Sequence, residues 1–318
     1  ATFLMSTSRL TLIIDLNLHM TLSHTNQPNV ADLSTLLARA ERVLQQLEHW
    51  LPPAPLPTDW SAHAFRWRKR GQGHGWLDPI NHVHVIHASD LHHITRQKET
   101  LDLNTKHFIE GKPANHVLMT GSRGTGKSSL VKAMLDRYAD QGLRLIEVDK
   151  SDMVDLSDIV DLVADRPERF IVFCDDLSFD EGELGYKALK SVLDGSASAT
   201  GHNVLVYATS NRRHLMPEYM HENLQAQHQP DGEVHPGETV EEKISLSERF
   251  GLWLSFYPFR QDDYLDIVAH WLKTLGCNAE QIADARTEAL QWTLARGSRS
   301  GRVAWHFARD WAARHVES

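Results

Sequence analysis

The ten residues GSRGTGKSSL, at positions 121–130, constrain the fold of this chain more than any other stretch. The pattern G-x-x-x-x-G-K-[ST] is filled by Gly121, Gly126, Lys127 and Ser128. The apolar run HVLMT comes directly before it, and the helix-forming segment KSSLVKAMLDRYA overlaps its end. Glycines in such a loop let backbone N–H groups converge on phosphate oxygens at the positive end of the following helix. A strand–loop–helix unit that binds phosphate groups is therefore predicted.

The whole loop is the expected binding site for the phosphates of a nucleotide. Lys127 is expected to neutralise the charge of the β- and γ-phosphates, and the hydroxyl of Ser128 is a candidate ligand of Mg²⁺. The loop residues expected to contact the nucleotide are Gly121, Ser122, Arg123, Gly124, Thr125, Gly126, Lys127, Ser128 and Ser129.

Strand-like and helix-like segments alternate from residue 116 onward. The apolar runs that predict strands are HVLMT, LRLIEV, RFIVFCDD, NVLVYATSN and LWLSFYPF, and segments with a helical pattern separate most of them. RFIVFCDD is continuously apolar before its acids, as expected of a strand that is covered on both faces. This order predicts an α/β fold of the P-loop NTPase type, with a five-stranded, mostly parallel sheet sandwiched by helices.

The two ends of the chain differ from this alternating part. Residues 260–316 show no strand pattern and predict three helices, which would form a small all-helical lid domain. Near the N-terminus, apolar residues spaced three and four apart predict a helix over 29–51, which ends at PPAPLP. The expected organisation is an N-terminal helical extension and linker at 1–80, an α/β nucleotide-binding domain at 81–258 and the lid at 259–318.

Two acids follow the third predicted strand. The run FIVFCDD delivers Asp175 and Asp176 to the carboxyl end of that strand, which is the edge where open α/β sheets bind ligands. Asp175 is expected to hold Mg²⁺, directly or through water. Asp176 either orients or deprotonates an attacking water molecule, or caps the segment that follows.

The run FRWRKR interleaves four cations with two aromatic residues. Such a composition can bind the phosphates of a nucleic acid and stack its bases. The alternative is a solvated linker whose aromatic side chains pack into the neighbouring domain. The chain as a whole carries 33 Lys and Arg against 42 Asp and Glu, a formal charge of −9. It therefore has no overall electrostatic attraction to nucleic acid, and this local run is the only support for such a partner.

Composition also bears on the compartment. The two cysteines, Cys174 and Cys277, are far apart in sequence and form no disulfide framework. The apolar opening LTLIIDLNLHM is interrupted by polar residues and is too short to span a bilayer. We expect a cytoplasmic protein without a membrane partner.

The order of the glycine loop, CDD, ATSN and SERFG, followed by a helical tail, resembles the AAA+ ATPases. Within that superfamily the chain is similar to an uncharacterised bacterial family of predicted AAA+ ATPases, designated a domain of unknown function. The similarity covers about residues 80–318 and is weaker around 65–68. The stretches that carry it are ANHVLMTGSRGTGKSSLVKAML, RFIVFCDDLSF, YKALKSVLDG, VYATSNRRHLMPE and ERFGLWLSFYPF. The resemblance implies an AAA+ fold that binds ATP with Mg²⁺ and hydrolyses ATP, and it brings no known substrate.

The resemblance also implies roles for single residues. Asn211 would be the polar sensor that hydrogen-bonds the attacking water or the γ-phosphate, and its alternative role is a strand-end cap. Arg249 in SERF matches the arginine finger, which reaches into the site of a neighbouring subunit. The alternative for Arg249 is a local ion pair with Glu248 or Glu241.

The resemblance implies further residues on the lid and around the adenine ring. Arg302 in GSRSGRVAWHF matches the second sensor arginine, with Arg299 as its rival, and either would couple the angle of the lid to the bound nucleotide. Leu91 and Ile94 lie where family members pack the adenine ring. The full catalytic set that the pattern and the resemblance imply is Lys127, Asp175, Asp176, Asn211, Arg249 and Arg302.

One position departs from the AAA+ pattern. Most members have glutamate where this chain has Asp176, and aspartate is one methylene shorter. A slightly different backbone must therefore bring the carboxylate to the water. The Asp-Asp pair also resembles the helicase-loader and transposition-helper ATPases, which implies turnover that is slow or gated by a partner.

The expected function is hydrolysis of ATP by a homo-oligomeric ring that drives a conformational change on a macromolecular client. A DNA-linked loader or switch of the same fold is the alternative, with FRWRKR as its only support. A P-loop kinase acting on a small molecule would explain the loop but leaves ATSN, SERF and the helical tail without roles. The polar segment 212–247 is longer than a usual connection and is expected to contact a substrate or an adjacent subunit.

Overall fold

The computed structural model describes residues 34–43, 57–69, 75–82, 85–179, 184–195, 202–211, 227–228, 234–235 and 246–316. The chain divides into two compact units, residues 1–56 and 57–318. In the first unit, residues 34–43 form a helix with exposed side chains, inside the range where the apolar stripe predicts one. The rest of that predicted helix and most of the polar segment 212–247 lie outside the described residues.

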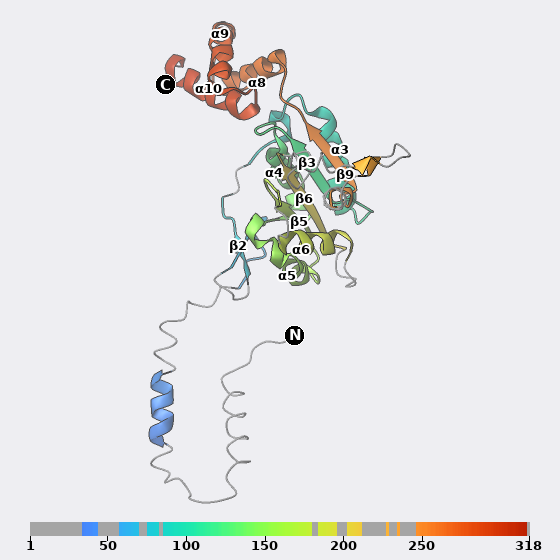
Figure 1. Cartoon of the computed structure of the whole chain (residues 1–318). Helices are drawn as coiled ribbons and strands as arrows, with labels where there is room; N and C mark the ends of the chain where they lie inside the picture. Colours follow the sequence, from blue (N-terminus) through green and yellow to red (C-terminus); the bar gives the residue numbers. More distant parts are fainter. Residues whose placement is uncertain are drawn as a thin grey trace, which may run out of the picture. The chain divides into compact units, whose positions relative to one another are not determined.

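A seven-stranded sheet forms the centre of the second unit (Figure 1). Its strand order is β2-β1-β4-β5-β6-β3-β9, and every neighbouring pair is parallel except β1 with β2. The strands are β1 (Ala64–Arg68), β2 (Trp76–Pro79), β3 (Val117–Gly121), β4 (Leu143–Glu147), β5 (Arg169–Cys174), β6 (Val204–Ser210) and β9 (Leu252–Phe256), and a separate antiparallel ladder joins β7 (Gln227–His228) to β8 (Val234–His235). The mostly parallel α/β fold expected from the sequence is confirmed.

The sheet contains the five predicted strands and two more. β1 and β2 fall within residues 1–80, the range assigned to an extension and linker. The sequence signal for β1 is a period of two, because Phe65 and Trp67 are 0% and 3% exposed while Arg66 and Arg68 alternate with them. The basic residues concealed this strand, and the compact unit that holds the sheet begins at Pro57.

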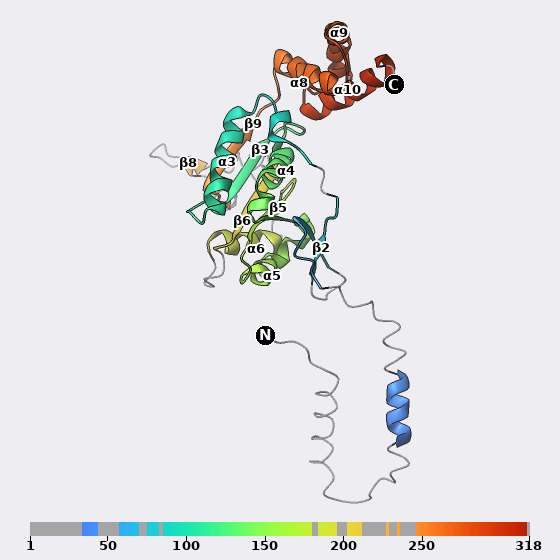
Figure 2. The ribbon, with the colours of Figure 1, turned by 180° about the vertical axis from the view of Figure 1, so that it is seen from behind.

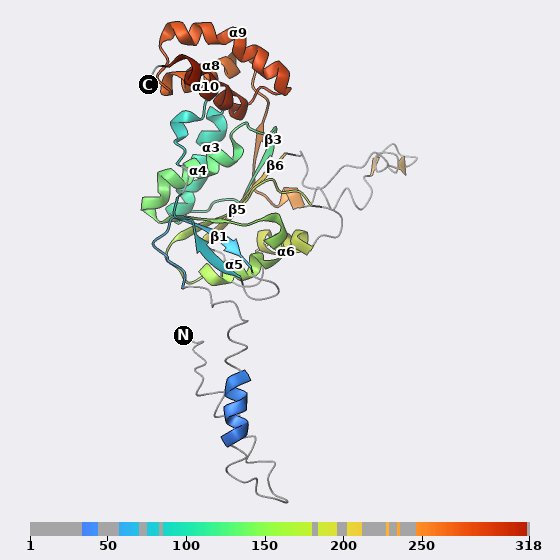
Figure 3. The same ribbon diagram turned by 90° about the vertical axis from the view of Figure 1, so that its left-hand side faces the viewer.

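Helices cover both faces of the sheet (Figure 3). α3 (Thr95–Ile109) and α4 (Lys127–Tyr138) pack on one face, and α5 (Leu156–Val163) and α6 (Leu184–Leu193) pack on the other. Consecutive strand residues alternate between the two cores. In β5, Ile171 and Phe173 join the core of α4, whereas Val172 joins the core of α5. Burial on both sides explains why this strand is continuously apolar.

Three helices follow the last strand of the sheet (Figure 2). They are α8 (Gln261–Thr274), α9 (Ala279–Arg296) and α10 (Gly301–His315). Side-chain caps fix two of their starts, since Asn278 accepts a hydrogen bond from the Gln281 N–H at 2.9 Å and Ser300 accepts one from the Val303 N–H at 3.3 Å. Buried residues of all three helices belong to the same core as α4. The predicted helical region therefore shares a continuous hydrophobic core with the helix that follows the glycine loop.

Candidate functional site

The loop joins the end of β3 to the start of α4. Gly121, Gly124 and Gly126 have φ values of 130°, 72° and 101°, in the region that glycine tolerates and other residues rarely adopt. At Gly121 an added Cβ would lie 1.8 Å from the carbonyl oxygen of Phe256 in β9, so no side chain fits there. The glycine spacing therefore reflects both the backbone conformation of the loop and the close approach of a neighbouring strand.

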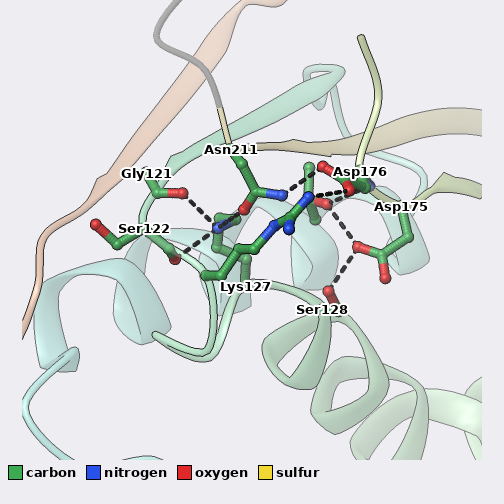
Figure 4. Close-up of polar contacts among 9 residues, drawn as sticks. Gly121, Ser122, Lys127, Ser128, Asp175, Asp176 and Asn211 are labelled. Atoms are coloured by element: carbon green, nitrogen blue, oxygen red, sulfur yellow. Dashed lines mark hydrogen bonds and ion pairs between the residues drawn. The ribbon is translucent and has the colours of Figure 1, made fainter. Parts of the chain in front are cut away.

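Lys127 is the first residue of α4 and is only 6% exposed. Its Nζ donates hydrogen bonds to the carbonyl oxygens of Gly121 (2.6 Å) and Ser122 (2.8 Å) and to Oδ1 of Asn211 (3.1 Å) (Figure 4). Burial lowers the pKa of Lys127, and nearby carboxylates oppose that shift. A cation held mainly by neutral carbonyl groups gains from contact with an anion, which a bound phosphate would supply.

Ser128 and Asp175 lie side by side in the same region (Figure 4). The Ser128 hydroxyl donates to Oδ1 of Asp175 at 2.6 Å, and the Thr209 hydroxyl donates to the same oxygen at 2.6 Å. Hydroxyl and carboxylate oxygens are ligands that Mg²⁺ prefers, so this pair fits that ion. Within the described residues, no group of three or more His, Cys, Asp or Glu side chains could hold a metal ion by itself. A Mg²⁺ ion here would take its remaining ligands from phosphate oxygens and water.

Asp176 is held differently from its neighbour. Its φ of 53° is uncommon for a residue other than glycine, and its backbone N–H donates to Oγ1 of Thr209 at 2.9 Å. One carboxylate oxygen accepts a hydrogen bond from the amide of Asn211, and the other accepts one from the Arg123 guanidinium at 3.1 Å. Both oxygens are thus bound by side chains of the site. The capping role considered for Asp176 is disfavoured by these contacts.

Asn211 connects the lysine with the second acid. It follows β6, which lies between β3 and β5 in the sheet, so that the carboxyl ends of these three parallel strands meet at one edge. Its amide oxygen accepts from Lys127 and its amide nitrogen donates to Asp176 (Figure 4). One side chain therefore contacts both the cation of the loop and the carboxylate beyond β5, which a strand-end cap would not require.

A cavity of about 740 Å³ borders the loop. Leu91 and Ile94 lie against Gly126, where an added Cβ would be 3.8 and 3.3 Å from their side chains. Gly121 and Ser122 do not line the cavity and instead use their carbonyl oxygens to hold Lys127. The sequence-predicted residues that line it are Leu91, Ile94, Arg123, Gly124, Thr125, Gly126, Lys127, Ser128, Ser129, Asp175, Asp176, Asn211 and Arg302.

Sequence reasoning missed most of the apolar lining of this cavity. Trp271 of α8 and Trp305 of α10 line it, and their ring centroids are 4.7 Å apart. Helical periodicity tells which residues share a helix face but not whether that face meets a core or a cavity. The other lining residues that were missed are Val85, Ile86, Asp90, His92, Thr209, Phe259, Ile267 and Gly301.

The start of α10 contacts the loop directly. The Gly301 N–H donates to the carbonyl oxygen of Gly124 at 2.8 Å, and a Cβ added to Gly124 would lie 2.9 Å from Oγ of Ser300. Both arginines are exposed, but Arg302 lines the cavity and Arg299 does not. Of the two rival arginines, the structure brings Arg302 to the site.

Arg249 lies outside the cavity lining. Its Nε bonds to Oδ1 of Asp194 at 2.5 Å, just beyond the end of α6. Asp194 is a third acid, different from the two that the sequence offered as local partners, and one of those, Glu241, is outside the described residues. The structure therefore does not bring Arg249 together with the other predicted catalytic residues of its own chain.

Acids neutralise most of the basic run at 65–70. Its two aromatic side chains are buried, which agrees with the reading in which they pack into the neighbouring domain. Arg70 lies outside the described residues. Three of the four cations face carboxylates, in the pairs Arg66–Glu147 (2.8 Å), Arg68–Asp78 (3.6 Å) and Lys69–Asp155 (2.7 Å). These pairs give the cations a role within the chain, and the nucleic-acid interpretation stays a prediction.

Fold and loop together define the class of this protein. A mostly parallel sheet, a G-x-x-x-x-G-K-[ST] loop after one of its inner strands and a helical C-terminal region give it the fold of a P-loop NTPase. Residues 60–315 match the model of a family described as "Protein of unknown function (DUF815)", and the chain belongs to that family. The match includes β1 and β2 as well as the stretches that carried the sequence resemblance.

Solved structures with a similar arrangement include an Escherichia coli HORMA:CdnC:Trip13 complex (13% identity, 70% of this chain and 89% of that chain, TM-score 0.45). The Aeropyrum pernix Orc1 protein in complex with DNA is 15% identical over 71% of this chain and 61% of that chain, with a TM-score of 0.48. A Thermotoga maritima RuvB mutant is 14% identical over 67% and 60%, with a TM-score of 0.42. This chain thus spans about three fifths of the latter two. No curated protein sequence matches the chain.

None of the helices in the described ranges is both long and apolar enough to cross a membrane.

Proposed function

We propose that the chain is a Mg²⁺-dependent ATP hydrolase that works as a homo-oligomer on a macromolecular client. The observation that carries this proposal is the chain of contacts Lys127–Asn211–Asp176 beside the pair Ser128–Asp175. These contacts bring together in one cavity a cation that can bind phosphates, two side-chain oxygens that can bind a metal ion and a carboxylate that can orient a water molecule. The apolar lining of the same cavity suits a purine base.

Phosphate binding is assigned to the loop. Lys127 and the backbone N–H groups from Arg123 to Ser129 hold the β- and γ-phosphates at the start of α4. Ser128 and Asp175 hold Mg²⁺, directly or through water. When bound, this ion neutralises phosphate charge and orients the oxygens to which it binds.

Hydrolysis needs a water molecule in line with the γ-phosphate. Asp176 orients that water and accepts a proton from it while the new oxygen–phosphorus bond forms, and Asn211 fixes the water or the γ-phosphate by a hydrogen bond. The bond from the γ-phosphorus to the bridging oxygen breaks, and ADP and inorganic phosphate leave. The proton passes from Asp176 to the phosphate product, which restores the carboxylate. Positioning and electrostatics supply the rate.

The residues around the adenine ring and the lid link ATP hydrolysis to the position of the lid. Leu91 and Ile94 pack the adenine ring, and Trp271 adds an aromatic surface from the lid. Arg302 contacts the γ-phosphate from the start of α10. Loss of that phosphate removes its anionic partner, so the preferred angle of the lid changes with the state of the nucleotide.

Arg249 is assigned to the site of a neighbouring copy, and this assignment supports a ring. It does not line the cavity of its own chain, and its side chain is 23% exposed beside Asp194. An arginine supplied in trans spreads the charge that develops on the γ-phosphate and is worth about 10³ to 10⁵ in rate in other NTPases. The client is a macromolecule, with the polar segment 212–247 as a candidate contact.

A cytoplasmic location accompanies this proposal. Cys174 and Cys277 are free and buried, which suits a reducing compartment that contains ATP. The loader or switch function keeps the same fold and still depends on the basic run at 65–70, three of whose cations face carboxylates. A small-molecule kinase would require an acceptor, so consumption of ATP without any added acceptor separates it from a hydrolase.

The decisive experiment combines hydrolysis, nucleotide binding and sizing. Purified chain is assayed for phosphate release with ATP and Mg²⁺ and is sized with and without them. Arg249→Ala should retain ATP binding and lose hydrolysis, and mixing it with an inactive Lys127→Ala chain should restore activity at mixed sites. If the wild type binds no adenine nucleotide, the hydrolase is excluded. If a monomer hydrolyses at full rate, the role of Arg249 in trans is excluded.

A further inference from the structure

Arg123 is a loop residue whose side chain is bound to the proposed water-orienting acid. Its Nη2 lies 3.1 Å from Oδ2 of Asp176, and the two side chains are 74% and 56% exposed. Both residues also line the cavity. Arg123 therefore lies between two anionic positions, the carboxylate that it contacts and the phosphate chain that the loop is proposed to hold.

Each carboxylate oxygen of Asp176 accepts one hydrogen bond in this arrangement. The Asn211 amide donates to Oδ1, Arg123 donates to Oδ2, and Thr209 fixes the backbone N–H. A carboxylate whose two oxygens both accept hydrogen bonds has less capacity left to orient a water molecule. In this state the carboxylate of Asp176 is held in place, and each of its oxygens already accepts a hydrogen bond from a side chain.

The contact of Arg123 is the one that a nucleotide can exchange. An exposed ion pair is weak, whereas a guanidinium binds phosphate oxygens through two parallel hydrogen bonds. The backbone around Arg123 is fixed, because the adjacent Gly124 carbonyl accepts from the Gly301 N–H at 2.8 Å. The flexible side chain is thus the part that is free to move.

We propose that Arg123 is a positioning residue that pairs with Asp176 in the nucleotide-free chain and turns to the terminal phosphate of a bound triphosphate. The turn releases Asp176 to water only when a γ-phosphate is present. This exchange rests on the proposed function, and it makes the loop itself discriminate ATP from ADP. It also gives a cause for gated turnover that lies within a single chain.

The test is a double-mutant cycle read by equilibrium binding rather than by hydrolysis. The full chain, Arg123→Ala, Asp176→Asn and the double variant are titrated with Mg²⁺ and either ADP or the non-hydrolysable analogue AMP-PNP. The measured quantity is the preference for AMP-PNP over ADP. Arg123→Ala should lower this preference by about tenfold, and Asp176→Asn should raise it by about threefold to tenfold.

The sign of the coupling decides between exchange and a static pair. In the exchange, Asp176 competes for Arg123, so Asp176→Asn raises the preference more when Arg123 is present than when it is absent. In a static pair, Arg123 only screens Asp176, so the same substitution matters more once Arg123 is removed. The proposal is overturned if Asp176→Asn has a larger effect without Arg123 than with it, or if the two substitutions show no coupling.

Controls separate this result from folding defects and from failure of the proposed function. Arg286→Ala removes an exposed arginine of α9 that does not line the cavity and should leave the preference unchanged. Arg123→Lys keeps the charge and should restore part of the preference. If the wild type binds neither nucleotide, the proposed function fails. If it binds both and Arg123→Ala leaves the preference unchanged, only the exchange fails.

Discussion

The cavity has two walls that are built in different ways. The loop wall, formed by the loop and the residues after β5 and β6, is polar and is held by hydrogen bonds of 2.6 to 3.1 Å. The second wall, called the lid wall, is apolar and is held by packing. Its residues are Phe259, Trp271 and Trp305 of the lid together with Leu91 and Ile94, which precede α3. Charge must be positioned closely to act on phosphate, whereas many combinations of apolar side chains can pack against a base. Strand and loop patterns therefore predict the residues of the loop wall, whereas Phe259, Trp271 and Trp305 of the lid wall are not predicted by any local pattern.

The largest expected effect comes from removing the cation of the loop wall. Lys127→Ala removes the donor that Nζ supplies to the Gly121 carbonyl and to the Asn211 amide oxygen, and one of the two donors of the Ser122 carbonyl. We expect ATP hydrolysis to fall by about 1,000-fold, in the range found for loss of a charge-stabilising donor. Phosphate release measures it, with circular dichroism as the check on folding. Retention of more than about a tenth of the wild-type rate would exclude the phosphate role of Lys127.

The next largest effect tests the backbone of the loop wall. At Gly121 a Cβ would meet a main-chain oxygen at 1.8 Å, so Gly121→Ala should lower the free energy of unfolding by about 3 kcal/mol or more. Gly142 is the matched control, because its φ is also positive, at 95°, but an added Cβ has no atom within 4 Å. Gly142→Ala should lower the free energy of unfolding by only about 1 kcal/mol. Equal losses in urea unfolding would mean that conformation, and not the clash, sets the requirement at Gly121.

A smaller effect concerns the support of the loop wall at the other end of β3. The N–H of Val206 donates to Nδ1 of His116 at 2.9 Å, and burial lowers the pKa of this histidine to about 4. The unfolded chain binds this proton near the ordinary pKa, so the stabilisation is complete above about pH 6.5 and is lost as the pH falls toward 4. The expected loss of unfolding free energy from this group between about pH 7.5 and pH 5 is about 2 kcal/mol.

Urea unfolding at the two pH values measures this loss, and His116→Gln is the comparison variant. Its amide oxygen can accept the Val206 N–H but does not titrate. The variant should show a smaller loss of stability on acidification than the wild type. The same pH dependence in both chains would show that other groups are responsible.

The smallest predicted effect is on the lid wall. Trp271→Ala removes an aromatic surface from the cavity, and we expect ATP affinity to fall by about fivefold to tenfold while the rate at saturating ATP changes less. Trp271→Phe keeps a ring and should restore most of the affinity. If Trp271→Ala lowered ATP hydrolysis as much as Lys127→Ala does, the two walls would not differ in their contribution to the reaction.

The sequence predicted the loop wall because its residues follow strand ends. Lys127, Asp175 and Asn211 each occur at a fixed place after an apolar run, and a parallel sheet brings such places to one edge. Leu91 and Ile94 came from the family resemblance, and the structure brings both to the cavity. Their placement could not be worked out from the local pattern alone.

The missed features depend on contacts between distant segments. β1 joins the sheet beside β4, which lies almost 80 residues further along the chain, and its arginines masked the alternating pattern. One partner of Arg249 is Asp194, 55 positions away, and no sequence pattern links them. Trp271 and Trp305 look like ordinary core residues of an amphipathic helix until the lid is folded against the loop.

The hydrogen bond from the Gly301 N–H to the Gly124 carbonyl has a mechanical consequence. It joins the backbone of α10 directly to the backbone of the loop that is proposed to bind the phosphates, with no side chain between them. A change in the position of α10 relative to the loop therefore has to break this bond or move the loop backbone with it.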